Sequence, residues 1–154
     1  RLDLKQNPLY EDTDMVLLDT HYYGGVKKYQ WVTLPLAMHG VIAKKDGSVV
    51  EINIGEKPED PVFGVSDLLI HLSGDQMEKK GAKVIEGEAL DILVGSMPLE
   101  AKTEEEKKVK TLVQANVLKI LKETYGVEEE DFLSAENRDR SGRSGKEIMV
   151  LTAV

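Results

Sequence analysis

The clearest pattern of apolar and polar positions lies between residues 36 and 54. Two apolar, β-branched runs, Leu36–Ala43 and Ser48–Ile54, flank the segment Lys44–Gly47. The Asp-Gly pair in this segment readily adopts the positive φ of a tight turn, which predicts a β-hairpin. Along the second run, apolar and polar residues alternate: Val50, Glu51, Ile52, Asn53 and Ile54. One face of the hairpin is therefore expected to be buried and the other hydrated, with the rest of the domain packed around it.

Shorter apolar runs predict further strands before and after the hairpin. Turn signals separate these runs, among them Asn7-Pro8 and the pair Gly24-Gly25, whose missing side chains let the chain bend sharply. A proline-punctuated loop, residues 56–61, follows the hairpin. The predicted strands are Arg1–Lys5, Met15–Thr20, Gln30–Leu34 and Leu90–Val94, with a helical turn at Val26–Tyr29 and a short extended piece at Val62–Val65.

One long helix with well-marked ends is predicted over Thr103–Tyr125. Thr103 and Glu106 have the spacing of a capping box, and Gly126 suits the left-handed stop position. Apolar residues at helical spacing give this helix a broad stripe that must lie on the sheet or on a partner chain. The stripe consists of Val109, Leu112, Val113, Val117, Ile120 and Leu121.

Shorter helices are predicted on both sides of this long one. Ser66 is placed to cap a helix over Asp67–Leu72, and a second short helix is expected over Asp75–Lys80. The segment Val127–Glu136 starts with an acidic run and is expected to add one more turn, anchored by Phe132 and Leu133. Together these elements predict a β-rich α+β fold in one domain, since 154 residues suffice for a single core.

Charge and composition exclude several classes of protein. The formal net charge of -8 argues against a nucleic-acid surface, and no apolar run is long enough to span a membrane. The chain has no cysteine, which excludes disulfides, thiolate metal sites and cysteine nucleophiles and fits a reducing compartment such as the cytoplasm. Abundant Glu and Lys without Cys also suit a heat-stable protein of a thermophile.

The search for catalytic chemistry by spacing gives mostly negative results. A zinc hydrolase needs converging His or carboxylate ligands, whereas His21, His39 and His71 stand far apart in the chain. Neither a glycine-rich nucleotide loop nor a nucleophilic serine elbow is present. The acidic run Glu128–Asp131 is compatible with a cation site, but such a run is more often a solvated helix start. By the same standard His71, within Leu69–Leu72, is most simply a hydrogen-bonded packing residue.

A succession of short motifs resembles the aspartyl aminopeptidase family of dinuclear zinc exopeptidases. The resemblance covers Arg1 to Glu136, and the order of the motifs makes it specific although each motif is short. The matching segments are Arg1–Tyr10, His21–Gly25, Pro61–Phe63, Asp67–Leu72 and Asp131–Glu136.

The resemblance implies that residues 1–136 are the domain inserted in the catalytic α/β domain of such an enzyme. In the family the metal ligands stand just before the segment corresponding to Arg1 and well after Glu136, so the zinc belongs to the intact enzyme and none is expected to bind this chain. The inserted domain is a barrel-like module with flanking helices that builds a homodimer and larger homo-oligomers. The intact enzyme removes N-terminal, acidic residues from peptides, whereas this chain alone is expected to be inactive. Its start, directly in a strand, is expected to be a cut from something larger.

The resemblance also gives individual residues a role. His71 matches a histidine that reaches the active site of the neighbouring subunit, where it binds substrate or stabilises the developing oxyanion, as a fixed imidazole donor can. Tyr22, Gly24 and Gly25 match the family pattern as well. We interpret these three as structural, because a double glycine beside a sheet needs no ligand to explain it.

The agreement with the family stops at Asn137. Residues 137–154 are expected to be either a disordered tail or the product of a reading-frame shift. Possible codons for Asn137–Gly142, read one nucleotide later, give Ile-Glu-Ile-Val-Pro-Ala, which resembles the family's continuation. Lys146–Val154 would need a different offset, so a single shift does not explain the whole tail.

Two functions from different classes are carried forward. The first is the assembly domain of a zinc aminopeptidase, and the second is a free-standing small-molecule-binding or regulatory β-barrel. The first predicts self-association through a two-fold interface, for which the Trp31 strand and the apolar stripe of the long helix are the candidates.

Overall fold

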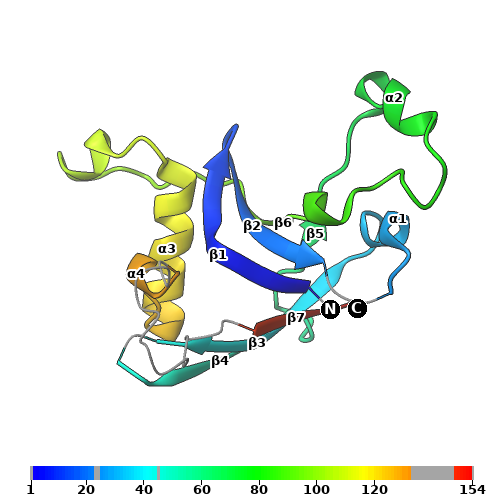
Figure 1. Ribbon diagram of the computed structural model, residues 1–154. Coiled ribbons are helices and arrows are strands. Elements are labelled where there is room, and N and C mark those ends of the chain that lie inside the picture. Colours follow the sequence, from blue (N-terminus) through cyan, green and yellow to red (C-terminus); the bar gives the residue numbers. More distant parts are fainter. Residues whose placement is uncertain (1, 23–24, 45, 133–147, 154) are drawn as a thin grey trace.

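Figure 1 shows the computed structural model of the chain, which describes residues 2–22, 25–44, 46–132 and 148–153. Its strands form two sheets, one of four strands in the order β1-β2-β6-β5 and one of three strands in the order β4-β3-β7. All neighbouring strands are antiparallel. The strands are β1 (Leu2–Asp12), β2 (Met15–Tyr22), β3 (Leu36–Ala43), β4 (Val49–Ile54), β5 (Gly64–Val65), β6 (Ile92–Gly95) and β7 (Ile148–Ala153).

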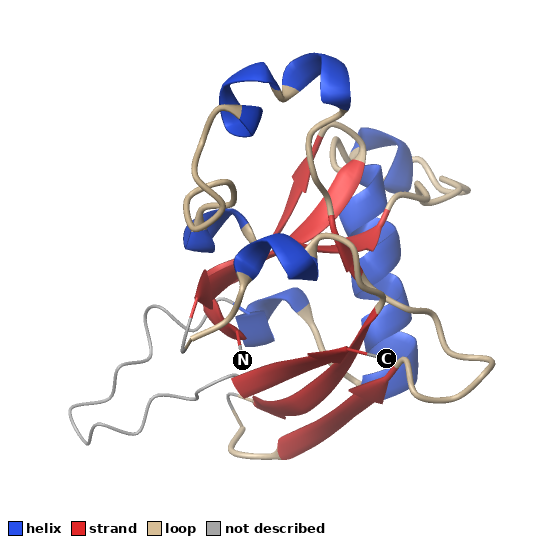
Figure 2. Ribbon diagram, turned by 90° about the vertical axis from the view of Figure 1, so that its right-hand side faces the viewer, coloured by secondary structure: helices blue, strands red, loops and turns tan. Residues whose placement is uncertain are grey.

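Helices connect the strands and flank the sheets. Figure 2 shows α3, the longest of them, running alongside both sheets. The α-helices are α1 (Lys28–Trp31), α2 (Gly74–Met77), α3 (Leu112–Tyr125) and α4 (Glu129–Phe132), and the 3-10 helices are η1 (Ile70–Leu72), η2 (Gly87–Ala89) and η3 (Glu106–Lys108). The predicted α+β class is confirmed. The barrel-like detail is not, because the described strands stay in two sheets that do not close into a barrel.

The predicted hairpin is confirmed as β3 and β4. Its turn is closed by a hydrogen bond from Lys44 N to Ser48 O of 2.8 Å, and Gly47 has the expected positive φ of 85°. Ile52 is buried at 4% exposure, whereas the neighbouring Glu51 and Asn53 are exposed. The alternation along β4 therefore places one face toward the core.

The hydrophobic core lies between the two sheets and α3. Both sheets contribute to it because each buries the face that points at the other. Its most deeply buried members include Leu18, Leu36, Met38, Ile42, Ile52, Leu90, Ile92 and Val127.

The first strand is longer than predicted. Asn7-Pro8 does not end it, since β1 continues to Asp12 and only shifts its register against β2 between Leu4 and Leu9. β1 is the edge strand of its sheet, next to β2 on one side only. Proline is tolerated on such a strand because an N–H that points outward makes no hydrogen bond to another strand of the sheet. The turn falls instead at Thr13 and Asp14, with positive φ of 49° and 62°.

The strand predicted over Gln30–Leu34 is wrong. Residues 28–31 form α1, and the chain then turns, with the backbone N–H and the hydroxyl of Thr33 both donating to the carbonyl of Gln30. Local hydrogen bonds thus override the strand preference of Trp31 and Val32, which pack their side chains against the core from a helical turn.

The predicted long helix is divided in two. Thr103 and Glu106 do form the reciprocal bonds of a capping box, at 2.9 and 3.2 Å, but these bonds lie in the turn that leads into η3, whose N-cap is Glu105. Helix α3 begins at Leu112, where the backbone N–H of Gln114 donates to Glu11 Oε2 of β1 at 2.7 Å. At the other end, Gly126 has the predicted left-handed conformation, with φ 65°.

The helix predicted over Asp67–Leu72 is also wrong, and α2 is shorter than the predicted Asp75–Lys80. Only η1 forms in the first of these segments, with Leu69 extended just before it. A short helix is stabilised mainly by packing an apolar face, and Leu68, Leu69 and Leu72 have no core to pack on because each is more than half exposed.

The strand β7 lies within residues 137–154 and pairs with β3 from Leu36↔Ala153 to Val41↔Ile148. Residues 137–147, where the change of character was expected to begin, lie outside the described residues. Among the described helices, none combines the length and the apolar character needed to cross a bilayer.

Candidate functional site

The predicted site residue His71 lies on an exposed apolar surface. Within ten residues, five large apolar side chains are each between 55% and 71% exposed. We call this surface the His71 ridge, and it consists of Leu68, Leu69, Ile70, Leu72 and Met77. The segment that carries it, with α2, projects away from both sheets (Figure 1). His71 is exposed, so the structure does not place it in the core as a packing residue.

Polar groups under the ridge fix its shape. Ser73, only 3% exposed, donates from its hydroxyl to the carbonyl of Ile70 at 3.1 Å, and its backbone carbonyl accepts from Met77 N at 2.9 Å. Asp67 Oδ1 accepts from Leu68 N and from Gln76 Nε2, at 2.8 and 2.9 Å. These bonds tie the start of the segment to α2, so the apolar side chains between them are held outward.

A cleft of about 290 Å3 separates the ridge from the region of α1. His71 is not among the residues that line this cleft, so its ring does not close on its own domain there. The lining combines apolar and hydrogen-bonding side chains: Tyr29, Val32, Thr33, Asp67, Leu68, Ile70, Ser73, Gln76, Met77, Val84 and Ile85.

The other two histidines lie elsewhere and each faces a single carboxylate. His21 Nδ1 is 3.4 Å from Glu88 Oε1, and both side chains are more than half exposed. His39 Nε2 is 3.2 Å from Glu56 Oε1. This nitrogen atom is buried and forms no hydrogen bond of good geometry with a described residue. In the described part of the chain, no three His, Cys, Asp or Glu side chains are placed to hold a metal ion. The residues present there do not fit a zinc site.

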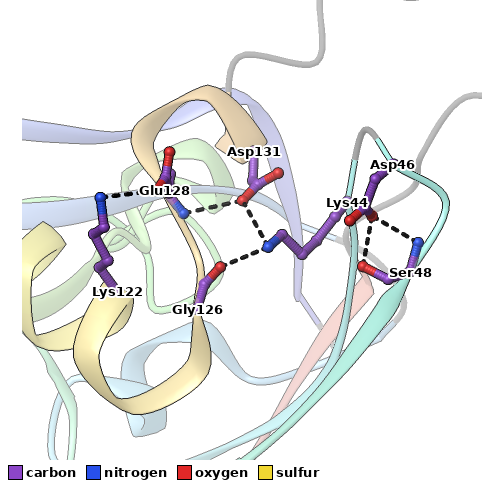
Figure 3. Close-up of polar contacts among 7 residues, drawn as sticks. All are labelled: Lys44, Asp46, Ser48, Lys122, Gly126, Glu128 and Asp131. Carbon is purple, nitrogen blue, oxygen red and sulfur yellow. Dashed lines mark hydrogen bonds and ion pairs between the residues drawn. The ribbon is translucent and has the colours of Figure 1, made fainter.

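The acidic run at residues 128–131 is structural in part (Figure 3). Asp131, 8% exposed, accepts from the backbone N–H of Glu128 at 3.0 Å and lies 3.8 Å from Lys44 Nζ. The same ammonium donates to the carbonyl of Gly126 at 2.6 Å. Glu128 pairs with Lys122 at 2.9 Å, and this hydrogen bond lowers the pKa of the Glu128 carboxyl. Lysines therefore meet two of the carboxylates, and the run anchors the hairpin turn to the end of α3.

Sequence reasoning missed a polar cluster inside the four-stranded sheet. Tyr10 donates to Asp91 Oδ2 at 2.9 Å, and Asp91 Oδ1 accepts from Thr20 N at 3.2 Å. Burial raises the pKa of Asp91, and burial together with the Asp91 hydrogen bond raises the pKa of Tyr10 to about 12. The available signal was Asp91 itself, a single carboxylate between Leu90 and Ile92 in an apolar run.

The remaining predicted residues add little to the site. Gly25 lies in a bend, where neither its backbone conformation nor the space around it requires a glycine, so its structural role stays an interpretation. Gly24, Leu133 and the side chains of Tyr22 and Phe132 lie outside the described residues.

Comparisons with known proteins agree on one family. A family profile described as "Aminopeptidase I zinc metalloprotease (M18)" matches residues 1–138. A probable M18 family aminopeptidase 1 of Clostridium acetobutylicum is 64% identical over 136 residues, which are 88% of this chain and 28% of that protein. Its counterpart in Thermotoga maritima is 53% identical over 136 residues, with the same two shares.

Solved structures lead to the same family. The crystal structure of an M18 family aminopeptidase from Thermotoga maritima matches with a TM-score of 0.79 at 44% identity, over 99% of this chain and 30% of that one. The structure of aminopeptidase I from Clostridium acetobutylicum gives 0.73 at 55% identity, over 97% and 30%. This chain spans less than a third of the length of these relatives. It belongs to the M18 family of aminopeptidase I zinc metalloproteases.

Proposed function

We propose that this chain is the assembly domain of a zinc aminopeptidase, inserted in a catalytic α/β domain, and that it completes the substrate pocket of a neighbouring subunit. The whole enzyme would remove N-terminal, acidic residues from peptides in the cytoplasm. The observation that carries the proposal is the exposed position of His71 on an apolar ridge, in a chain whose match covers 28% of the length of an aminopeptidase.

The position of the ridge supports a role in a neighbouring subunit. Exposed apolar patches are costly in water and commonly mark surfaces that bind a partner, and the ridge has five exposed apolar side chains. His71 lies in the middle of this patch, so a partner that covers the ridge would bring its own surface onto the imidazole. In a water-excluded interface, an imidazole N–H is a suitable donor to a developing oxyanion.

Because the described residues do not fit a zinc site, we assign the zinc ligands to the rest of the enzyme and propose that the chain alone is inactive.

The first test measures activity of the isolated chain. The purified chain, supplied with Zn²⁺, is incubated with peptides that begin with Asp or Glu, and released amino acid is quantified. We expect no release above the background of a matched buffer. Release that rises in proportion to chain concentration and disappears with a chelator would contradict the proposal.

The second test addresses His71 in the longer enzyme that would contain this chain. His71→Phe keeps the bulk of the ring, so folding and assembly should be unchanged while turnover falls on the order of a hundredfold. His21→Phe, at another exposed histidine, is the matched control and should keep full turnover. A His71→Phe enzyme that melts earlier but retains its specific activity when folded would end the catalytic interpretation.

A mixing experiment then separates action within a subunit from action across the interface. His71→Phe enzyme is mixed with enzyme that lacks a zinc ligand, under conditions that exchange subunits. If His71 serves the neighbour, mixed oligomers regain part of the lost activity, because some sites combine intact ligands with an intact histidine. Activity that stays at the level of the separate variants would place His71 in its own subunit's site.

One observation favours the alternative function, a free-standing small-molecule-binding or regulatory protein. The space between the sheets and α3 contains an apolar cavity of about 370 Å3, within the size range of ligand pockets. A chain that stays monomeric in solution and binds a metabolite there would favour this alternative over the assembly domain.

A further inference from the structure

The cavity between the sheets and α3 is apolar and carries no charge. Its floor includes the buried side chains Leu18, Ile42 and Ile52, from one strand of the first sheet and both strands of the hairpin. None of its lining residues is an Asp, Glu, Lys, Arg or His. Asn116 and Tyr125 of α3 supply the polar side-chain groups of the lining.

Liquid water is a poor occupant of this space. A buried water needs two to four polar partners, and apolar cavities stay dry when these are missing. The Asn116 amide already donates to the carbonyl of Met97 at 3.0 Å. Among the described residues, no hydrogen bond reaches the Tyr125 hydroxyl, so a polar group of an occupant can pair with it. An unfilled cavity destabilises a fold in proportion to its volume.

Size and access favour a small organic molecule over a segment of chain. The volume of about 370 Å3 is more than twice the roughly 150 Å3 of an engineered apolar cavity that binds benzene. Of the lining side chains, Met97 and Ile120 are 73% and 53% exposed, and they mark the side from which a ligand can enter. The unbranched, flexible side chain of Met97 suits an entrance that adapts to its occupant.

Charge restricts the ligand further. Burial and the negative charge of Asp60 raise the pKa of Tyr125, so its hydroxyl stays protonated at neutral pH. An ionised ligand group would enter the cavity without a counter-charge, at a high desolvation cost. We propose that this cavity is a binding site for a neutral, mostly apolar small molecule of about bicyclic size with one hydrogen-bonding group placed at Tyr125.

The experiment uses the 154-residue chain with two probes of equal ring size. The neutral probe is 2-naphthol and the charged one is naphthalene-2-sulfonate, and binding is measured by calorimetry and by ¹H–¹³C methyl NMR. We expect saturable binding of 2-naphthol, one per chain, with a rise in melting temperature and shifts at the methyls of Leu18, Ile42 and Ile52. The sulfonate should bind at least tenfold more weakly. Absence of 2-naphthol binding, or equal binding of both probes, would overturn the proposal.

Variants locate the site. Ile54→Phe on β4 and Val117→Phe on α3 both fill the cavity and should abolish binding, and either one suffices if the other does not fold. Val49→Phe is the matched control, because Val49 is on the same strand as Ile54 but 61% exposed. Tyr125→Phe should weaken 2-naphthol binding about threefold to tenfold, the range of one neutral hydrogen bond. Filling variants that bind as the wild type does would place the probe elsewhere and refute the site.

A second copy of the chain is the competing occupant. If another copy covers the entrance at Met97 and Ile120, the NMR signals of their methyl groups will shift with protein concentration. Added 2-naphthol will then not displace the second copy. That result would overturn the small-molecule assignment and identify the opening as a protein contact. The outcome is independent of the tests on His71, which lies in another part of the fold.

Discussion

Asp91 shows how one residue can join strands that are far apart in the sequence. Asp91 lies directly before β6. Its carboxylate accepts from Tyr10 of β1 and from the backbone N–H of Thr20 in β2. A partly buried carboxylate is tolerated where donors meet it, and here each of its two oxygens accepts one hydrogen bond. The apolar run around Asp91 therefore predicts the strand correctly but does not reveal which groups the acid will meet.

Tyr10 should make stability fall at alkaline pH. Its pKa is raised from 10.0 to about 12 in the folded chain, so its contribution is fully present below pH 10 and is lost as the pH rises to 12. Tyr10→Phe removes this dependence and, at neutral pH, costs about 0.5–1.5 kcal/mol for the lost hydrogen bond. Urea denaturation at a series of pH values from about 8 to about 12 measures the free energy of unfolding of the wild type and of Tyr10→Phe. Tyr29→Phe, at a tyrosine 45% exposed, is the control, and parallel curves for wild type and Tyr10→Phe would contradict the prediction.

Gly55 is a position where no other residue fits. Its φ is 108°, and a Cβ there would lie 2.9 Å from Ala37 Cα of the neighbouring strand. Gly55→Ala should destabilise the chain by about 1–3 kcal/mol, through backbone strain and overpacking. Gly74→Ala in α2, with open space around it, should instead stabilise by about 0.4–1 kcal/mol. Equal urea midpoints for both variants would show that the close approach at Gly55 is not tight.

At the scale of elements, the parts predicted correctly are those whose causes are local. The hairpin follows from alternation and an Asp-Gly turn, and the end of α3 follows from Gly126. The start of α3 could not be predicted, because Glu11, 103 residues away in sequence, supplies the carboxylate that caps Gln114. Likewise Leu68, Leu69 and Leu72 have helical spacing, but spacing does not tell whether a core lies opposite them.

The link between the hairpin turn and the end of α3 should act as a coupled unit. Lys44 donates to the carbonyl of Gly126 and faces Asp131, and their side chains are only 22% and 8% exposed. Lys44→Met should cost about 1.5–3 kcal/mol, since it removes the ammonium that faces the buried Asp131 carboxylate and donates to the carbonyl of Gly126. In a double-mutant cycle with Asp131→Asn, the coupling should be about 0.5–3 kcal/mol.

The exposed pair beside it is the control for this cycle. Lys122 and Glu128 are 66% and 54% exposed, so solvent screens their attraction and Lys122→Met should change the urea midpoint little. If Lys44→Met and Lys122→Met have the same small effect, the hairpin turn is held by its own hydrogen bonds and the link to α3 is not needed.

For the whole molecule, the resemblance pointed to His71, but the sequence could not show its surroundings. The spacing of apolar residues suggested the Trp31 region and the α3 stripe as interfaces, whereas both are largely turned toward the core. The exposed apolar area gathers on the His71 ridge because that segment leaves the sheets, a consequence of tertiary packing that no local pattern contains. Ile120 and Val109, 53% and 38% exposed, are the members of the stripe that stay most accessible.

Self-association through the ridge is the prediction that belongs to the molecule as a whole. Sedimentation velocity at high micromolar concentration should show dimers of the wild-type chain. The double variant Leu69→Glu, Leu72→Glu should be monomeric, because a two-fold interface would bring each new charge against the apolar surface of a copy. Val49→Glu, at a valine on β4 that is 61% exposed, should remain dimeric. A wild-type chain that is only monomeric would refute self-association. If Ile120→Glu abolishes the dimers and the ridge variant keeps them, the interface lies on α3. The ridge would then give no reason to place His71 beside a neighbouring subunit.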